Sequence, residues 1–182
     1  MLVEATPLDG VYLFTPKVFG DERGFFLESW NAEVFREAGF DLDFVQDNHS
    51  RSVQGTLRGL HYQTRHTQGK LVRVTSGSVF DVAVDLRRDS PGLGRWFGTV
   101  LDARKHAMLW IPPGFAHGFY VLSESADFQY KCTDRYDPDS EVSIAWDDPE
   151  LAIDWPLVDG RAPSLSKKDQ VGIAFAEAPR LR

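Results

Sequence analysis

The sequence contains one cysteine, Cys132, among its 182 residues. A single cysteine cannot form an internal disulfide and cannot supply a cluster of thiolates around a metal ion. Both absences are typical of proteins in a reducing compartment, so we expect a cytoplasmic location. Because a free cysteine behaves as a small apolar side chain, we also expect Cys132 in the core.

Long apolar runs are missing as well. No stretch approaches the roughly 20 consecutive apolar residues that a membrane-spanning helix requires. The first ten residues, MLVEATPLDG, have neither the basic start nor the apolar block of an export signal. The sequence therefore predicts no membrane association, and a formal glycosylation sequon at Asn48 is set aside because it requires secretion.

Positive charge is in deficit, with 20 lysine and arginine residues against 27 aspartate and glutamate residues and a net charge of −7. A surface of this sign repels nucleic acid, so no nucleic-acid partner is expected. An anionic ligand would need a local group of basic side chains.

Several familiar motifs are absent. The sequence has no GxGxxG after a strand, no phosphate loop ending in GKS or GKT, and no GxSxG elbow. Residues 92–94, Gly-Leu-Gly, are better explained as a turn. We therefore expect neither a bound dinucleotide or ATP cofactor nor a common serine hydrolase.

What the sequence does contain is a series of short strand-like runs. It is 42% hydrophobic and 26% charged, and its length fits one globular domain over residues 1–182. Apolar side chains in residues 78–86 alternate with Asp81 and Asp85, which predicts a half-buried strand. Residues 70–75 precede it across a Ser76-Gly77 turn, so the two runs are predicted to form a hairpin.

Further elements follow from the same patterns. Asn31 is predicted to cap a helix that ends at Gly39, with an apolar stripe at Val34, Phe35 and Ala38. The proline-rich segment from residue 147 onward predicts loops with short helical turns. More strands are expected at 108–111, 119–122, 128–132 and 142–146, separated by turn-rich segments at 89–94 and 136–141. Many short strands of this kind predict a mainly β sandwich or barrel.

Polar residues are concentrated in the stretch GTLRGLHYQ, residues 55–63, where Arg58 and His61 stand three residues apart. The upstream segment 44–50 adds the amide side chains of Gln46 and Asn48. These residue types bind oxygen-rich anions and sugars through directional hydrogen bonds. A structural histidine and a solvated loop arginine remain the alternative at this point.

The segment Pro112 to His117 has the pattern Pro-x-Gly-x-x-His between two strand-like runs, and it resembles the second motif of the cupin superfamily. Metal-dependent cupins usually carry His-x-His and a glutamate in their first motif, whereas this sequence has only His61 there. We expect no metal, but a facial triad of metal ligands made by His61, His117 and a carboxylate remains an alternative.

A longer series of blocks carries a closer resemblance. In order and at nearly uniform spacing over residues 7 to 170, the sequence resembles the dTDP-4-dehydrorhamnose 3,5-epimerase family in these segments: PKVFGDERGFFLE (16–28), FVQDNHS (44–50), LRGLHYQ (57–63), QGKLVRV (68–74), VFDVAVDLR (79–87), WIPPGFAHGF (110–119), YDPDSE (136–141) and LSKKDQ (165–170). The tail, residues 173–182, has no recognisable pattern.

The resemblance implies a cupin-type double-stranded β-helix, or jelly roll, with a few short helices and no metal or cofactor. It implies an isomerase that inverts carbons 3 and 5 of dTDP-4-dehydro-6-deoxy-D-glucose, a dTDP-linked 4-keto-6-deoxyhexose, to give dTDP-4-dehydro-L-rhamnose. Each inversion needs a base for the proton next to the 4-keto group, a stabiliser for the enolate, and an acid on the opposite face.

Four residues match the family's catalytic positions. His61 matches the general base, Asp169 the carboxylate that orients it, Lys70 the enolate stabiliser and Tyr130 the general acid. Without the resemblance, Asp169 would be interpreted as a surface aspartate, Lys70 as a solvated charge and Tyr130 as a core residue. Sequence alone would not pair His61 with Asp169, because more than a hundred residues separate them.

The resemblance also assigns substrate contacts, listed here by number: Arg23, Glu28, Gln46, Asn48, Arg58, His117, Glu141 and Lys168. Arginine suits a diphosphate because its planar fork gives paired, charge-assisted hydrogen bonds, which is the role expected of Arg58. Thymine is expected to stack on an aromatic ring, with Phe19, Phe26 and Tyr136 as unranked candidates. The family implies a homodimer with exchanged N-terminal strands, in which Arg23 and Glu28 complete the partner's site.

Three alternatives remain. A relative that epimerises only carbon 3 or carbon 5 of a related dTDP-4-keto-deoxysugar has much the same residues, although Tyr130 favours the double epimerase. A noncatalytic cupin that binds a nucleotide sugar is disfavoured by the presence of all four catalytic matches. A metal-dependent cupin is disfavoured by the missing His-x-His. The expected pathway is dTDP-L-rhamnose biosynthesis for a cell-surface polysaccharide.

Overall fold

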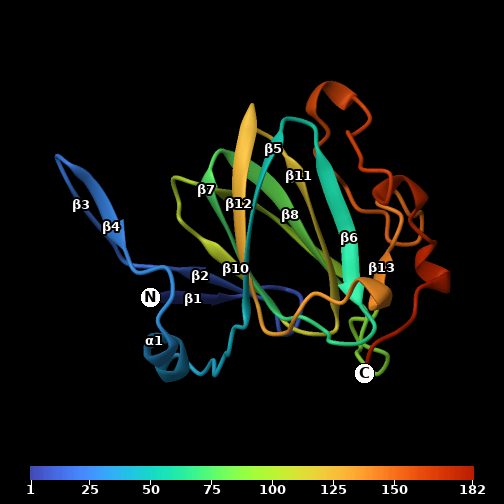
Figure 1. The fold of residues 1–182 in the computed structure, drawn as a ribbon, viewed down its shortest axis with the longest axis horizontal. Coiled ribbons are helices and arrows are strands. Elements are labelled where there is room, and N and C mark those ends of the chain that lie inside the picture. The colour runs from blue at the N-terminus through green and yellow to red at the C-terminus, as the bar shows by residue number, and fades with distance from the viewer.

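The computed structural model describes residues 1–182 and consists mainly of antiparallel strands in two large sheets (Figure 1). The six-stranded sheet has the order β1 (Leu2–Ala5), β2 (Tyr12–Thr15), β10 (Met108–Ile111), β7 (Lys70–Ser76), β12 (Ser125–Cys132), β5 (Gln46–Val53). The five-stranded sheet has the order β13 (Glu141–Ser143), β6 (Leu57–Gln63), β11 (Phe115–Val121), β8 (Ser78–Asp85), β9 (Trp96–Asp102). The sheets face each other, which confirms the expected jelly roll.

A small hairpin and short helices complete the chain. Strands β3 (Val18–Asp21) and β4 (Gly24–Leu27) form a two-stranded sheet that projects away from the jelly roll at the left of Figure 1. Helix α1 (Ala32–Glu37) follows the hairpin. A 3₁₀ turn, η1 (Pro138–Ser140), lies in the turn-rich segment 136–141. The 3₁₀ turns η2 (Val158–Gly160), η3 (Asp169–Val171) and η4 (Phe175–Glu177) confirm the prediction of short helical turns after residue 147. No helix in the structure has the length and apolar character needed to span a membrane.

The predicted cap of α1 is confirmed. Asn31 Oδ1 accepts hydrogen bonds from the backbone N–H groups of Glu33 at 3.0 Å and Val34 at 3.4 Å, which satisfies two otherwise unpaired donors. Gly39, with φ +92°, ends the helix. Phe35 is buried, but Ala38 is exposed and lies outside the apolar face.

The predicted hairpin between β7 and β8 is wrong. β7 pairs with β10 and β12 in one sheet, whereas β8 pairs with β9 and β11 in the other. The Ser76-Gly77 connection therefore carries the chain from one sheet to the facing sheet. Alternation identified both strands correctly, but a tight connection does not specify whether its strands pair or pack face to face.

The predicted half-buried strand at β8 is also wrong, because Asp81 and Asp85 are both fully buried. Their face of β8 looks into the space between the sheets, where Ala83 belongs to the central core. The opposite face, with Val82 and Val84, is covered by the C-terminal segment. Layers on both sides therefore bury this strand from Asp81 to Asp85.

Apolar packing forms three layers. The central layer lies between the sheets and includes Val72, Leu109 and Phe128. A second layer joins the outer face of the five-stranded sheet to the C-terminal segment. The tail, which had no recognisable sequence pattern, packs into this layer through Phe175 and Leu181. The third lies under α1 and contains five buried residues: Phe14, Phe35, Leu71, Met108 and Trp110. Burial of Cys132 confirms its predicted core position.

The inter-sheet connection gives a stability prediction. Gly77 has φ +75°, and a Cβ added there would overlap the Ser125 carbonyl oxygen, whereas Gly39 has φ +92° with open space around it. Gly39→Ala should lower the free energy of unfolding by about 1–2 kcal/mol through backbone strain alone. Gly77→Ala should lower it by about 2–5 kcal/mol, because steric overlap adds to the strain. Urea denaturation at one protein concentration measures both, and equal losses would contradict the assignment.

Candidate active site

A cavity of about 370 Å³ opens between the two sheets. Every residue predicted for catalysis or for the listed substrate contacts lines it except Arg23 and Glu28. One wall comes from β6, β11 and β13 of the five-stranded sheet, and the other comes from β5, β7 and β12 of the six-stranded sheet. The lining residues are Gln46, Asn48, Ser50, Arg58, His61, Gln68, Lys70, His117, Phe119, Tyr130, Tyr136, Glu141, Ser166, Lys168 and Asp169.

His61 and Asp169 form a hydrogen-bonded pair at one side of the cavity. Nε2 of His61 lies 2.5 Å from Oδ1 of Asp169, a carboxylate that is only 3% exposed. The second carboxylate oxygen accepts a hydrogen bond of 2.7 Å from Ser166 Oγ, which also accepts one from the Asp169 backbone N–H. Both oxygens of Asp169 are therefore held, and the imidazole is oriented through them.

The C-terminal segment brings Asp169 to His61. Ile173 N–H donates to the Ser143 carbonyl at 2.9 Å, and Ser143 lies opposite His61 in the β13–β6 ladder. This contact fixes the segment after Asp169 beside the edge of the five-stranded sheet. It joins residues separated by more than a hundred positions, which explains why sequence patterns could not pair them.

Burial sets the charge states of the pair. Loss of hydration lowers the pKa of His61, and the hydrogen bond from its ring to Asp169 opposes this only in part. Burial acts to raise the pKa of Asp169, but the bonds from His61 and Ser166 outweigh it and hold that pKa below its usual range. The pair at neutral pH is a neutral imidazole beside a carboxylate, which can accept a proton from a ligand.

Lys70 and Tyr130 stand on the opposite wall. They lie on the neighbouring strands β7 and β12, whose register places Cys132 beside Lys70 and Tyr130 beside Val72. Burial lowers the pKa of Lys70, whose amine makes no hydrogen bond to the protein, and burial raises the pKa of Tyr130. The cavity therefore has an imidazole on one sheet and a phenol on the facing sheet.

A second histidine–carboxylate pair adjoins the cavity, with His117 in its lining and Asp81 buried behind it. His117 Nε2 is 3.0 Å from Oδ2 of Asp81, which has no exposed surface, and His117 faces His61 across the β11–β6 ladder. Sequence reasoning missed Asp81 as a site residue, although its place in the β8 alternation was the available signal. No group of three or more histidine, cysteine, aspartate or glutamate side chains is arranged to hold a metal ion.

The cavity mouth is polar and partly cationic. Arg58 Nε donates to Ser52 Oγ at 3.0 Å, and its guanidinium forms no ion pair. Lys168 is 2.6 Å from Glu141, whose other oxygen accepts a 2.7 Å hydrogen bond from Tyr136. That bond, with burial as a smaller effect, raises the pKa of Tyr136 to about 12. Sequence reasoning also missed four lining residues: Ser50, Gln68, Phe119 and Ser166.

The N-terminal hairpin lies apart from this cavity. Arg23 is highly exposed and pairs with Asp21 at 2.6 Å, while Glu28 follows directly after β4. Phe19 and Phe26 lie on the same hairpin. Tyr136 is thus the one thymine-stacking candidate that lines the cavity of its own chain.

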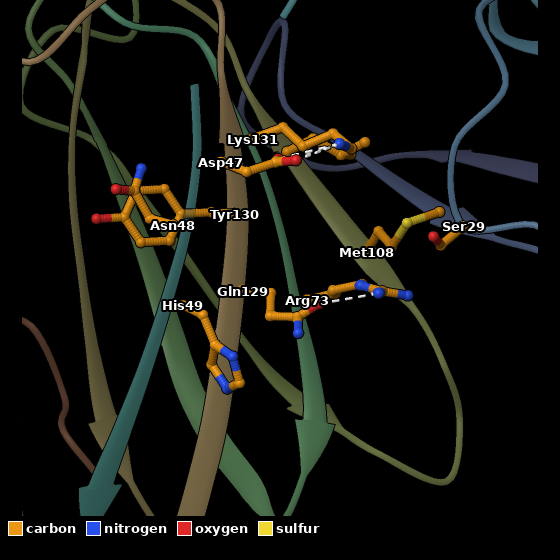
Figure 2. A pocket seen from close by; sticks show the side chains of 10 residues that line it. Ser29, Asp47, Asn48, His49, Arg73, Met108, Gln129, Tyr130 and Lys131 are labelled. Atoms are coloured by element: carbon orange, nitrogen blue, oxygen red, sulfur yellow. Dashed lines mark hydrogen bonds and ion pairs between the residues drawn. The ribbon is translucent and has the colours of Figure 1, made fainter. Parts of the chain in front are cut away.

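A groove marks the outer face of the six-stranded sheet (Figure 2). Arg73 donates to Gln129 at 2.9 Å, Lys131 pairs with Asp47 at 3.0 Å, and both contacts lie on its wall. Burial lowers the pKa of Arg73, which has no carboxylate partner. A neighbouring groove runs from Arg73 to Phe25 of the hairpin, so this face continues toward β3 and β4.

Comparison with known proteins gives consistent findings. The family model described as dTDP-4-dehydrorhamnose 3,5-epimerase matches residues 5–177. A dTDP-4-dehydrorhamnose 3,5-epimerase of Pseudomonas aeruginosa is 63% identical over 169 residues, which is 92% of each chain.

Two solved structures share the cupin-type fold. The dTDP-6-deoxy-D-glucose-3,5-epimerase of Legionella pneumophila, in complex with dTDP-4-keto-L-rhamnose, is 53% identical, with a TM-score of 0.94 over 98% of this chain and 94% of that one. A 3'-monoepimerase of Streptomyces bikiniensis, in complex with dTDP-quinovose, is 34% identical, with a TM-score of 0.87 over 94% and 86%. One fold therefore carries both double and single epimerases.

The histidine–carboxylate pair gives a testable titration. In Asp169→Asn the pKa of His61, already below its ordinary value of 6.5, should fall further, because the charged ring loses its neighbouring carboxylate. Proton NMR of the histidine ring measures this shift directly. Asp47→Asn removes a carboxylate from the outer face and should leave His61 unchanged; a rise in the His61 pKa in Asp169→Asn would contradict the arrangement.

Proposed function

This chain belongs to the dTDP-4-dehydrorhamnose 3,5-epimerase family, and from that membership we propose that it converts dTDP-4-dehydro-6-deoxy-D-glucose to dTDP-4-dehydro-L-rhamnose by inverting carbons 3 and 5. One observation supports this most directly. His61 and Tyr130 line opposite walls of one cavity, on facing sheets. Inversion of a carbon requires a proton to leave on one face and return on the other, which is the arrangement these walls offer.

His61 acts as the general base in this proposal. With Nε2 bonded to Asp169, the neutral ring carries its proton on Nε2 and keeps the lone pair on Nδ1. Nδ1 takes the proton from the carbon next to the 4-keto group, and the electron pair of the broken C–H bond moves onto the ketone oxygen. Asp169 and Ser166 hold the ring in place, and the carboxylate stabilises the imidazolium that forms.

Lys70 and Tyr130 complete each step. The Lys70 amine has no protein partner, so it is free to bond the enolate oxygen, whose negative charge favours the protonated amine. Tyr130 keeps its proton at neutral pH because burial raises its pKa, and it gives that proton to the carbon from the opposite face. One proton leaves and one returns at each centre, so no redox cofactor is required. Before the next inversion, His61 releases its proton to solvent and Tyr130 takes one up from solvent.

The remaining lining residues form the binding surface. Arg58, without an ion pair, is the anchor for the diphosphate, and Lys168 adds a second cation near the mouth. Tyr136 offers a ring for the thymine base. The polar groups proposed to orient the sugar are Gln46, Asn48, His117 and Glu141.

Deuterium incorporation tests the reaction. The EDTA-treated protein is incubated with dTDP-4-dehydro-6-deoxy-D-glucose in deuterium oxide, and the sugar is followed by proton NMR. Deuterium should enter at both carbon 3 and carbon 5, and His61→Ala should slow entry by about 10²–10⁴-fold, the usual contribution of a positioned base.

His49→Ala is the matched control, because His49 lies on the outer face of the sheet, where it contacts Asp127. It should keep the wild-type rate. Deuterium at one carbon only would identify a single-carbon epimerase, and no deuterium at either carbon would favour the noncatalytic binding protein.

We further propose a homodimer in which the hairpin of one subunit completes the site of the other. Phe25 and Phe26 are 64% and 70% exposed on a hairpin that projects from the jelly roll. Exposed aromatic pairs of this kind mark protein contacts. Arg23 and Glu28 lie at the same hairpin, outside the cavity of their own chain, so in a dimer they are available to the partner's substrate.

Mixing inactive subunits tests this sharing. Arg23→Ala and His61→Ala should each lose activity, but an equal mixture refolded together should recover about a quarter of it, because half the dimers are mixed and each has one intact site. A mixture of His61→Ala with Asp169→Asn should recover nothing, since both residues come from the same chain. Absence of recovery with Arg23→Ala, or a monomer in sedimentation, would contradict the proposal.

The cellular location and the pathway of the reaction are proposed from the same family membership. We propose that residues 1–182 act as one cytoplasmic domain, with the free, buried Cys132 in keeping with a reducing compartment. The product is still a ketone, so a reduction must follow before a stable L-rhamnose unit is available. The proposed destination is a cell-surface polysaccharide.

A further inference from the structure

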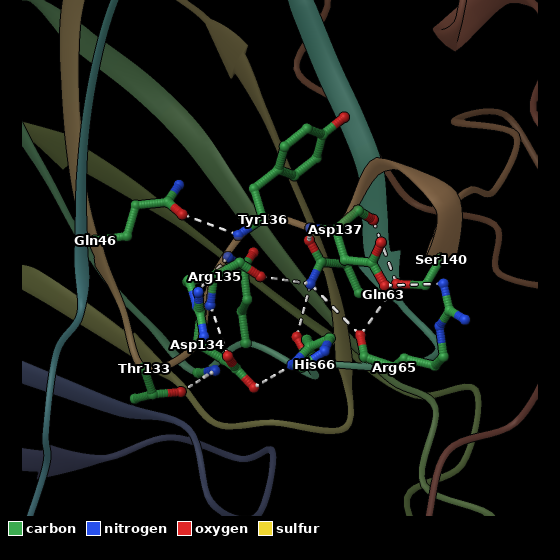
Figure 3. A network of polar contacts seen from close by, with 12 residues as sticks. Gln46, Gln63, Arg65, His66, Thr133, Asp134, Arg135, Tyr136, Asp137 and Ser140 are labelled. Atoms are coloured by element: carbon green, nitrogen blue, oxygen red, sulfur yellow. Dashed lines mark hydrogen bonds and ion pairs between the residues drawn. The ribbon is translucent and has the colours of Figure 1, made fainter.

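Two loops, each with one residue in the cavity lining, Gln68 and Tyr136, are tied together by polar contacts (Figure 3). Residues 64–69 connect β6 to β7, and residues 133–137 connect β12 to η1. Gly69 N–H donates to Thr133 Oγ1 at 2.8 Å, and the Gln68 amide donates to the Asp134 carbonyl at 2.8 Å. Since neither loop belongs to a sheet, these contacts take the place of a backbone ladder.

Gln63 lies at the centre of this network and is only 5% exposed. Its Nε2 donates to the His66 carbonyl at 2.6 Å and to the Arg135 carbonyl at 3.1 Å. Its Oε1 accepts a hydrogen bond of 3.0 Å from the Asp137 backbone N–H. One buried amide therefore holds the backbone immediately before and immediately after Tyr136.

Tyr136 is the residue that this arrangement presents to the cavity. Its backbone N–H donates to Gln46 Oε1 at 2.9 Å, and its hydroxyl donates to Glu141 at 2.7 Å, while the residue as a whole is 52% exposed. Two glutamine side chains thus fix three consecutive residues of a loop. Without them, the loop would lose the partners of buried polar groups and could move away from the cavity.

We propose that Gln63 is a positioning residue for substrate binding, which acts by holding Tyr136 against the bound dTDP-sugar. The inference rests on the proposed function for the identity of that ligand, but the clamp itself is a property of the chain. Gln63 does not line the cavity, so its effect on the reaction passes through the loop. Loss of the clamp should weaken substrate binding more than it slows the chemistry at His61.

Amide hydrogen exchange tests the clamp without any substrate. In Gln63→Met the amides of Tyr136 and Asp137 should exchange about tenfold faster than in the wild type, because a buried hydrogen-bonding partner is lost. Gln54→Met is the matched control, since Gln54 also donates to a backbone carbonyl, that of Leu122, at 2.7 Å, but does not line the cavity. It should leave both amides unchanged, and equal exchange in Gln63→Met and wild type would overturn the proposal.

Kinetics test the link to Tyr136. Gln63→Met should raise KM for the dTDP-sugar about tenfold with kcat within about threefold, and it should add almost nothing to the defect of Tyr136→Ala, because both changes remove the same contact. Multiplied defects in the double variant, or a loss confined to kcat, would overturn the positioning role. If the wild type lacks epimerase activity, the proposed function fails, while the hydrogen-exchange result still tests whether Gln63 holds the loop around Tyr136.

Gln63→Glu provides a second variant if Gln63→Met does not fold. It preserves the size of the side chain and an acceptor for the Asp137 amide but removes the donor to the Arg135 and His66 carbonyls. Its Asp137 amide should stay protected while KM rises. An unchanged KM in a folded Gln63→Glu protein would overturn the proposal.

Discussion

The structure depends on burying charged side chains between two sheets that are otherwise held together by apolar packing. Moving an ionised group out of water is costly unless other groups bond to it, so each buried carboxylate must find partners within the fold. Asp169 is bonded by His61 and Ser166, and Asp81 is bonded by His117. Lys70 differs, because its amine makes no hydrogen bond to the protein and is left for a ligand.

The apolar layers give these polar groups a fixed frame. The central layer packs the two sheets that form the cavity walls against each other, and the layer under the C-terminal segment holds the strand that carries His61. That same segment supplies Ser166 and Asp169. Packing on the outside of the five-stranded sheet thus determines the geometry inside it, which explains why a chain of 182 residues can hold so many polar groups in one cavity.

Alternation along single strands gives the six-stranded sheet two different surfaces. On β12, Gln129 and Lys131 line the outer groove together with Arg73 but not the cavity, whereas Tyr130 lines the cavity and also borders the groove. Because neighbouring residues of a strand point to opposite faces, the proposed catalytic wall and the face beside the hairpin share one set of strands. A molecule bound to the outer face would therefore be separated from the cavity only by the six-stranded sheet itself.

Much of this protein follows from the sequence. Short strand-like runs between turn-rich segments predicted β7, β8, β10, β11 and β12, and Asn31 with Gly39 predicted the helix, because capping is local. The ordered motifs around His61, Lys70 and Asp169 identified the family, and the resemblance then assigned Tyr130 and most of the other residues that line the cavity.

Contacts between distant segments were decided only by the tertiary structure. It placed β7 and β8 in different sheets and buried Asp81 and Asp85. It also joined Asp169 to His61 and bonded the Gln63 amide to the backbone on both sides of Tyr136. Local pattern reports how a residue relates to its chain neighbours, whereas burial and charge pairing depend on which segments pack against it. The sequence by itself determined the strands and the chemical groups, and packing determined which of those groups meet.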